Sequence, residues 1–146
     1  MNVVDAAQRL QVIDPLHSYC VSAPAGSGKT ELLIQRYLCL LGRVVKPEQV
    51  LAITFTRKAA AEMRERIVQA LQGAERGTAI LNPHQQRTRD LAKSVLIRDR
   101  EQCWNLLRDV SRLNIKTIDG FCSTLTRQMP ILSQFGGQVQ VLDDAD

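Results

Sequence analysis

The chain has 146 residues, of which 45% are hydrophobic, and a formal net charge of +4 at pH 7. This length suits one modest domain with a buried core, and no apolar run in the sequence is long enough to cross a membrane. Four scattered cysteines and two isolated histidines argue against a disulfide framework and a zinc site; they fit reduced thiols in a cytoplasmic protein. The positive charge favours a polyanionic partner.

The first predicted element is a short helix over residues 5–14. It ends before Pro15 because the residue that precedes a proline disfavours helical geometry. Its Gln8 is a candidate adenine reader, since one side-chain amide can pair with both N6 and N7 of that base. On the residue alone, an exposed helical glutamine without a ligand is the more common case.

A glycine-rich loop follows an apolar run and opens an apolar-periodic segment. The order predicts a strand over residues 19–23, a phosphate-binding loop and a helix over about residues 28–41. Gly26 and Gly28 allow a tight turn that presents N–H groups to an anion, and the helix adds its positive dipole end. The loop consists of Ala23, Pro24, Ala25, Gly26, Ser27, Gly28, Lys29 and Thr30.

This loop predicts a site for ATP and Mg²⁺. Lys29 is expected to reach the β- and γ-phosphates, and the Thr30 hydroxyl is expected to bind Mg²⁺, so both are candidate catalytic residues. The usual pattern has glycine where this chain has Ala23. We interpret that change as the mark of a subtype, because glycine matters less there than at the two later positions. The alternative is an ordinary glycine-rich turn.

Residues 49–55 predict a second strand, whose continuous apolar centre is typical of a parallel strand that is covered on both faces. Thr56 is a candidate cap for the next helix, over about residues 57–72. Apolar residues recur in that helix at helical spacing and predict its buried stripe. These residues are Ala59, Ala60, Met63, Ile67, Ala70 and Leu71.

Two stretches together resemble a known family. The glycine-rich loop, followed at residues 51–64 by Leu-Ala-Ile-Thr-Phe-Thr-Arg-Lys-Ala-Ala-Ala-Glu-Met-Arg, is similar to motifs I and Ia of the superfamily 1 DNA helicases of the UvrD/Rep/RecB type. The resemblance places Gln8 where that family keeps its adenine-reading Q motif. It implies a RecA-like P-loop NTPase fold, with ATP and Mg²⁺ as cofactors and DNA as the substrate.

The resemblance also implies a path for single-stranded DNA at the end of the second strand. Phe55 would stack on or contact a base, and Thr54, Thr56 and Arg57 would line the path. Many family members have Asn at the position of Arg57, but a guanidinium can also grip a phosphate. Independently, an aromatic residue beside a cationic helix start suits stacking combined with backbone contact.

Residues 73–83 predict a loop, and residues 84–100 and 101–110 predict helices in which Trp104 belongs to the core. The resemblance covers this stretch least. A helical insertion over about residues 78–110, between strands of the sheet, is similar to what the RecB-like branch tends to carry. It therefore favours the helicase–exonuclease branch related to RecB and AddA.

Residues 113–118 predict a third strand, followed by a helix to about residue 129. The run Thr-Ile-Asp-Gly-Phe at their junction resembles the family's third DNA-contacting motif, which makes Thr117 and Phe121 candidate DNA contacts. Asp119 stands where the family has histidine. Because a carboxylate would repel a phosphate, we assign Asp119 to the helix N-cap instead.

The tail, residues 136–146, admits two interpretations. Its apolar run ends in Asp143 and Asp144, which could be the Mg²⁺-binding acids of a Walker B strand. However, Gln138 and Gln140 alternate with valines, which indicates a half-exposed strand, whereas Walker B strands are central and continuously apolar. We favour the start of an inserted subdomain.

The elements together predict an α/β fold: part of a RecA-like P-loop NTPase domain, with a parallel sheet flanked by helices. Residues 1–128 would form the N-terminal part of helicase motor domain 1A, and residues 129–146 would begin the inserted subdomain. By resemblance, the parent protein would be an ATP-dependent DNA helicase of repair or recombination. It would translocate on single-stranded DNA and unwind duplex, with partner subunits of a helicase–nuclease complex.

The chain alone is expected to bind ATP without appreciable hydrolysis. It has no convincing Walker B pair, arginine finger or second motor domain, and phosphoryl transfer needs such groups together. Open apolar strand edges also predict self-association. Two alternatives remain: a non-catalytic module that binds nucleotide and single-stranded DNA, and a P-loop NTPase of another class, such as a small kinase.

Overall fold

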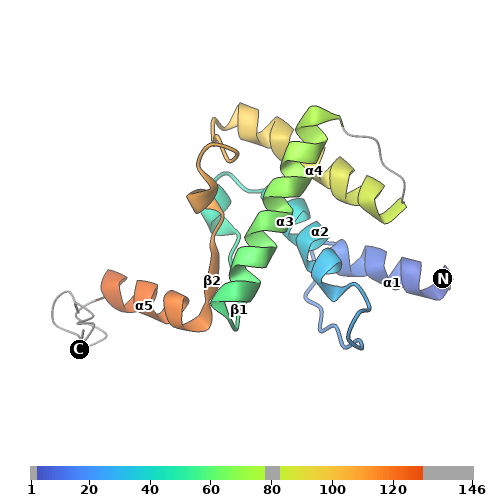
Figure 1. Cartoon of the computed structure of the whole chain (residues 1–146), viewed down its shortest axis with the longest axis horizontal. Helices are drawn as coiled ribbons and strands as arrows, with labels where there is room; N and C mark the ends of the chain where they lie inside the picture. The colour runs from blue at the N-terminus through green and yellow to red at the C-terminus, as the bar shows by residue number, and fades with distance from the viewer. Residues whose placement is uncertain (1–2, 78–82, 130–146) are drawn as a thin grey trace.

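The computed structural model describes residues 3–77 and 83–129. This part of the chain is mostly helical, with a small parallel two-stranded sheet, and is therefore an α/β structure (Figure 1). Its elements are α1 (Val3–Ile13), α2 (Lys29–Leu41), the 3₁₀ turn η1 (Pro47–Gln49), β1 (Ala52–Thr54), α3 (Arg57–Arg76), α4 (Pro83–Glu101), η2 (Val110–Arg112), β2 (Ile115–Thr117) and α5 (Ile118–Gln128). None of the helices in these ranges is both long enough and apolar enough to span a bilayer.

The core lies between α2, α3 and α4, which pack on one another. The predicted stripe of α3 is confirmed, with Ala60 and Met63 buried and Ala59 and Ala70 half-buried at its border. Burial of each large aliphatic side chain contributes about 1.5–3 kcal/mol to folding. The largest fully buried side chains include Ile34, Leu38, Leu41, Ile67, Leu71, Val95, Leu106 and Leu113.

A buried polar link joins α4 to the start of α2. The side chain of Gln35 donates to the Thr88 hydroxyl at 3.0 Å, and that hydroxyl donates to the Glu31 carboxylate. Gln35 and Thr88 are the buried polar residues of the described core, and each needs a partner because an unpaired buried polar group is costly. The predicted insertion therefore packs directly on the helix that follows the glycine-rich loop.

The sheet is a parallel pair, in which Ala52 lies opposite Ile115 and Thr54 lies opposite Thr117. Helix α3 contacts both strands, and the Arg64 guanidinium donates to the carbonyl oxygen of Ile115 at 2.8 Å. Ile53, which points to the other face, is 49% exposed. The prediction that β1 is covered on both faces is therefore wrong for the described part of the chain, because α3 covers only one face.

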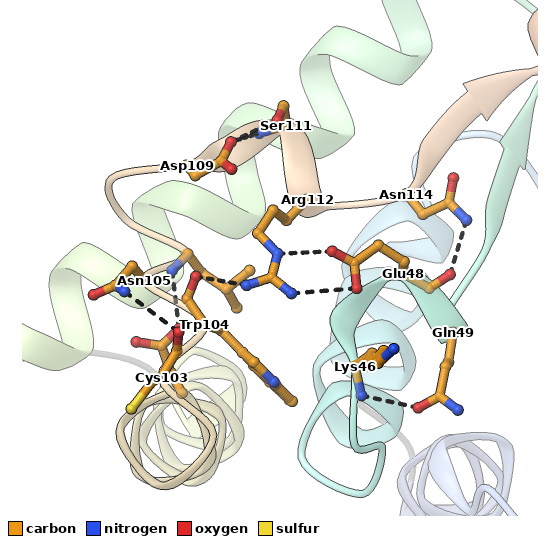
Figure 2. A network of polar contacts seen from close by, with 12 residues as sticks. Lys46, Glu48, Gln49, Cys103, Trp104, Asn105, Asp109, Ser111, Arg112 and Asn114 are labelled. Carbon is orange, nitrogen blue, oxygen red and sulfur yellow. Dashed lines mark hydrogen bonds and ion pairs between the residues drawn. The ribbon is translucent and has the colours of Figure 1, made fainter.

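A polar network fixes the amino ends of the two strands relative to each other (Figure 2). The Nε of Arg112 donates to the carboxylate of Glu48 at 2.7 Å, and its Nη1 donates to the carbonyl oxygen of Trp104 at 2.9 Å. This contact holds the pKa of the Glu48 carboxyl below its usual value. Asn114 donates to the Glu48 carbonyl at 3.0 Å, and the Trp104 indole donates to the Val45 carbonyl at 2.9 Å. Trp104 is 3% exposed, as predicted for a core residue.

Two predicted elements are absent from the described residues. Residues 19–23 form no strand; Tyr19 and Val21 are 39% and 41% exposed, and no described strand pairs with them. The predicted helix over residues 101–110 is also wrong. Helix α4 ends at Glu101, and Cys103 and Asn105 then adopt left-handed φ angles of 53° and 59°, which a right-handed helix does not allow.

Candidate nucleotide-binding site

The glycine-rich loop depends on two left-handed residues. Gly26 has φ +76° and Gly28 has φ +81°, and α2 begins directly after them at Lys29. A Cβ at Gly26 would meet nothing within 4 Å, so the backbone angle, and not lack of space, requires glycine there. The loop therefore ends on the amino terminus of a helix, where N–H groups without intrahelical partners favour an anion.

Lys29 lies across this loop. Its ammonium group donates to the carbonyl oxygens of Ala23 and Pro24, the second at 2.6 Å. A phosphate oxygen carries full negative charge and is a stronger acceptor for an ammonium group than a neutral carbonyl. Lys29 is therefore held at the loop by bonds that a triphosphate can replace.

A cavity of about 300 Å³ joins the loop to α1. Its wall includes Gln8 from α1, Tyr19 from the connection, and Ser27 and Lys29 from the loop and the start of α2. The structure thus brings together Gln8 and Lys29, two predicted nucleotide contacts that are 21 positions apart in the sequence. Pockets for small molecules commonly measure about 300–1,000 Å³, so this cavity suits part of a nucleotide.

Thr30 is exposed at the second position of α2. In the described residues, no group of three or more His, Cys, Asp or Glu side chains could enclose a metal ion. A Mg²⁺ ion that binds with a nucleotide does not need such a cage, because it takes most of its ligands from phosphate and water. A single exposed hydroxyl beside the loop fits that mode. Asp143 and Asp144 lie outside the described residues.

The predicted DNA contacts gather at the carboxyl ends of β1 and β2. Thr54 and Thr117 are directly opposite in the parallel register. Phe55 follows β1 and is 87% exposed, and Arg57 is exposed at the first position of α3. Phe121, in the first turns of α5, is half-buried and presents less of its ring.

Two threonines cap the helices that leave these strands. The Thr56 hydroxyl accepts from the N–H of Ala59 at 3.1 Å, which confirms the predicted cap of α3. Thr117 caps α5 by accepting from the N–H of Gly120 at 3.1 Å. The assignment of the α5 cap to Asp119 is therefore wrong, because the strand ends at Thr117 and Asp119 already lies within the first turn.

Comparison with known proteins adds to this geometry. The sequence profile of the UvrD/REP helicase N-terminal domain matches residues 4–146. The chain belongs to this family. The predicted resemblance to UvrD/Rep/RecB helicases is thereby confirmed. No solved structure is significantly similar to the chain.

Several curated UvrD/REP relatives are named as one subunit, designated A, of an ATP-dependent helicase/nuclease. The protein from Lactobacillus acidophilus is 34% identical over 139 residues, which are 94% of this chain and 10% of that protein. The one from Desulforamulus reducens is 39% identical over 111 residues, 74% of this chain and 7% of that protein. The one from Desulfitobacterium hafniense is 36% identical over 140 residues, 92% of this chain and 9% of that protein. The chain thus spans about a tenth of these relatives or less.

Sequence reasoning missed two arginines, one that contacts this UvrD/REP-family loop and one on the helix that follows it. Arg9 donates to the carbonyl oxygen of Ser27, and its Nη1 lies 3.3 Å from where a Cβ on Gly28 would stand. Because Arg9 directly follows Gln8, its place beside the same site could have been expected from the sequence. Arg36, on α2, donates to the carbonyl of Val12 at the end of α1 and to backbone carbonyls of the segment that follows, and no local sequence pattern predicts these contacts.

Proposed function

We propose that this chain is the nucleotide-binding part of the first motor domain of a DNA helicase, and that it binds ATP and Mg²⁺ at the glycine-rich loop. One observation carries the proposal: Gln8 and Lys29 line one cavity beside a loop with two left-handed glycines. Both ends of a nucleotide, base and phosphates, would thus find a suitable group. A small kinase or other P-loop protein would not explain membership of the UvrD/REP helicase family.

The proposed roles follow from chemistry. The Lys29 ammonium neutralises the β- and γ-phosphates in place of the two loop carbonyls, and the N–H groups at the start of α2 assist it. The Thr30 hydroxyl supplies one ligand of Mg²⁺. Gln8 donates to N7 and accepts from N6 of adenine. The remaining loop residues, Ala23, Pro24, Ala25, Gly26, Ser27 and Gly28, form the cradle.

The DNA contacts are proposed at the strand ends. Phe55 offers an exposed ring on which a base can stack, and Arg57 offers a charge for the backbone. Thr54 and Thr56 line the same edge. Thr117 and Phe121 are proposed as neighbouring contacts, with Thr117 also serving as the α5 cap.

At the level of the domain, we propose a RecA-like fold. The parallel pair β1 and β2, joined by a crossover through α3 and α4, supports this proposal, because parallel strands of one sheet need such a connection. Residues 1–128 would belong to motor domain 1A, with a helical insertion over about residues 78–110, and residues 129–146 would begin a further subdomain.

For the whole protein, we propose ATP-driven translocation on single-stranded DNA and duplex unwinding in repair or recombination, in the cytoplasm. The relatives' name supports a helicase–nuclease assembly with partner subunits. The chain alone is proposed to bind nucleotide without turnover, because phosphoryl transfer needs metal-binding acids, a positioned water and arginines together.

Substitution of Lys29 tests the nucleotide site. Lys29→Ala should weaken ATP affinity at least tenfold, about 1.4 kcal/mol, because it removes the main countercharge to the triphosphate. Titration calorimetry measures the affinity, and Lys93→Ala, which removes an exposed lysine from α4, is the matched control. Equal affinity of Lys29→Ala and the parent chain would refute the proposed phosphate cradle.

A further inference from the structure

Arg36 connects α2 to the segment that follows α1. Its Nη1 donates to the carbonyl oxygens of Val12 and of Asp14, the latter at 2.9 Å, and its Nη2 donates to that of His17 at 2.8 Å. The guanidinium also lies 5.5 Å from the centre of the Tyr19 ring, within range of a cation–π contact. One side chain thus contacts Val12 in the last turn of α1 and three positions of the irregular segment that follows it.

The turn held by Arg36 is ordered within itself as well. The Asp14 carboxylate accepts from the N–H of Leu16 at 3.0 Å and lies 3.0 Å from Nδ1 of His17. The hydrogen bond from the Leu16 N–H, and to a smaller extent the one with His17, keeps the pKa of the Asp14 carboxyl below its usual value. The turn is therefore ordered by its own hydrogen bonds, and Arg36 bonds to two of its backbone carbonyls.

Two of the four residues that Arg36 contacts line the candidate nucleotide cavity. Val12 and Tyr19 both line it, together with Gln8 and Lys29, whereas Arg36 lies outside its wall. Gln8 precedes Val12 by four positions, one helical turn, so fixing the end of α1 also fixes the position of Gln8.

Other anchors of α1 are few among its described side chains. Ile13 is buried at 7% exposure and Arg9 bonds to the loop, but Leu10 is 50% exposed. The contacts of Arg36 are therefore among those that set the position of Gln8 relative to the phosphate cradle. A planar guanidinium suits several carbonyls at fixed angles, which a lysine ammonium does not match.

We propose that Arg36 is a positioning residue for base selection: it fixes α1 against α2 so that Gln8 meets the adenine while Lys29 holds the phosphates. This inference rests on the proposed function and deepens it. Arg36 acts through Gln8 and has no contact with the phosphates. Its loss should therefore affect recognition of the base and leave recognition of the triphosphate intact.

The test compares three ligands with the 146-residue chain: ATP, GTP and inorganic triphosphate. Arg36→Gln should reduce the preference for ATP over GTP at least fivefold, and should change the affinity for inorganic triphosphate less than twofold. The matched control is Arg100→Gln, which removes an exposed arginine near the end of α4 and should leave all three affinities unchanged. Arg36→Lys, which keeps the charge and the fold, should still lose at least threefold in preference.

A double-mutant cycle separates positioning from general damage. In a Gln8→Ala background, Arg36→Gln should alter the ATP preference less than twofold, because the residue through which it acts is gone. An equal loss for all three ligands, or an unchanged preference in both Arg36 variants, would overturn the inference. A parent chain that binds triphosphate without preferring ATP would also overturn it and leave the phosphate cradle standing. A parent chain that binds none of the three would refute the proposed function, and this inference with it.

Discussion

Phe55 has the most exposed large apolar side chain in the described part of the chain, at 87%. Its ring contributes little to the core, so its removal should not affect folding. If the ring stacks on a base, Phe55→Ala should weaken binding to a single-stranded oligonucleotide by about 1–3 kcal/mol, while the thermal midpoint of unfolding stays unchanged. Fluorescence anisotropy with a labelled oligonucleotide measures the affinity.

Leu16→Ala is the control for the Phe55 substitution, because Leu16 is 77% exposed and lies far from the strand ends in sequence. It should leave DNA affinity unchanged. A Phe55→Ala variant that binds DNA as tightly as the parent chain would exclude Phe55 as a stacking residue.

At the scale of the element, the start of α3 depends on a single side chain. The Thr56 hydroxyl accepts from the N–H of Ala59, one of the amide groups that a helix leaves unpaired at its amino end. Thr56→Ala should lower the free energy of unfolding by about 1 kcal/mol, as measured by denaturant titration. Thr56→Ser keeps the hydroxyl and should recover most of that loss; a serine variant as unstable as the alanine variant would rule out the capping role.

The positions of α2 and α3 could be predicted from the sequence because their signals are local. Apolar residues at helical spacing, the glycine-rich loop before Lys29 and the cap at Thr56 all lie within or next to the helix that they define. Helix α3 extends beyond the predicted end, to Arg76, where Gly77 with φ +71° ends it. That Gln8 and Lys29 lie at one site could be predicted for the same reason, since each belongs to a short motif. Their contacts with a nucleotide stay a prediction.

The stretch after α4 could not be predicted in this way. Trp104 and Leu106 are both buried, although residues two apart point to different sides of a helix, so their spacing alone does not indicate which backbone conformation buries them. The chain instead turns through left-handed Cys103 and Asn105, and the N–H of Leu106 bonds to the Asp99 carboxylate at 2.9 Å. Contacts between segments far apart in the sequence set this geometry. The same holds for the hydrogen bonds of Arg36 to the turn after α1.

At the scale of the whole molecule, apolar side chains lie open on the sheet and on α5. Ile53 is 49% exposed on β1, and Ile118 and Leu125 are 47% and 38% exposed on α5, which contains no buried residue. Figure 1 shows α5 projecting from the strands, on the opposite side of the molecule from α1. Such a surface, next to a two-stranded sheet that is marginal by itself, invites contact with another chain.

We therefore expect the chain to self-associate at low micromolar concentration, as measured by sedimentation. Ile53→Lys should shift the equilibrium toward the monomer by placing a charge on the open face of the sheet. Ile97→Lys, at a 58% exposed position on α4, should have no such effect. A stable monomer of the parent chain at these concentrations would contradict the expectation.

Hydrolysis is the second property to test on the whole chain. We expect no appreciable phosphate release from ATP in the presence of single-stranded DNA, because the loop lysine and threonine alone do not complete the machinery of phosphoryl transfer. Turnover at a motor-like rate would instead assign the metal-binding role to Asp143 and Asp144. The interpretation of the tail as the start of a subdomain would then be wrong.

The left-handed angles of Gly26 and Gly28 also have a thermodynamic consequence. A free peptide of the same sequence would have to be ordered when it binds a ligand, at about 1–2 kcal/mol for each backbone residue fixed. In the folded chain this entropy is lost during folding, because α2 holds one end of the loop and Arg9 bonds to its centre. An arriving triphosphate therefore meets a preorganised surface. Substitutions that loosen α2 should weaken binding even when every group that touches the phosphates is intact.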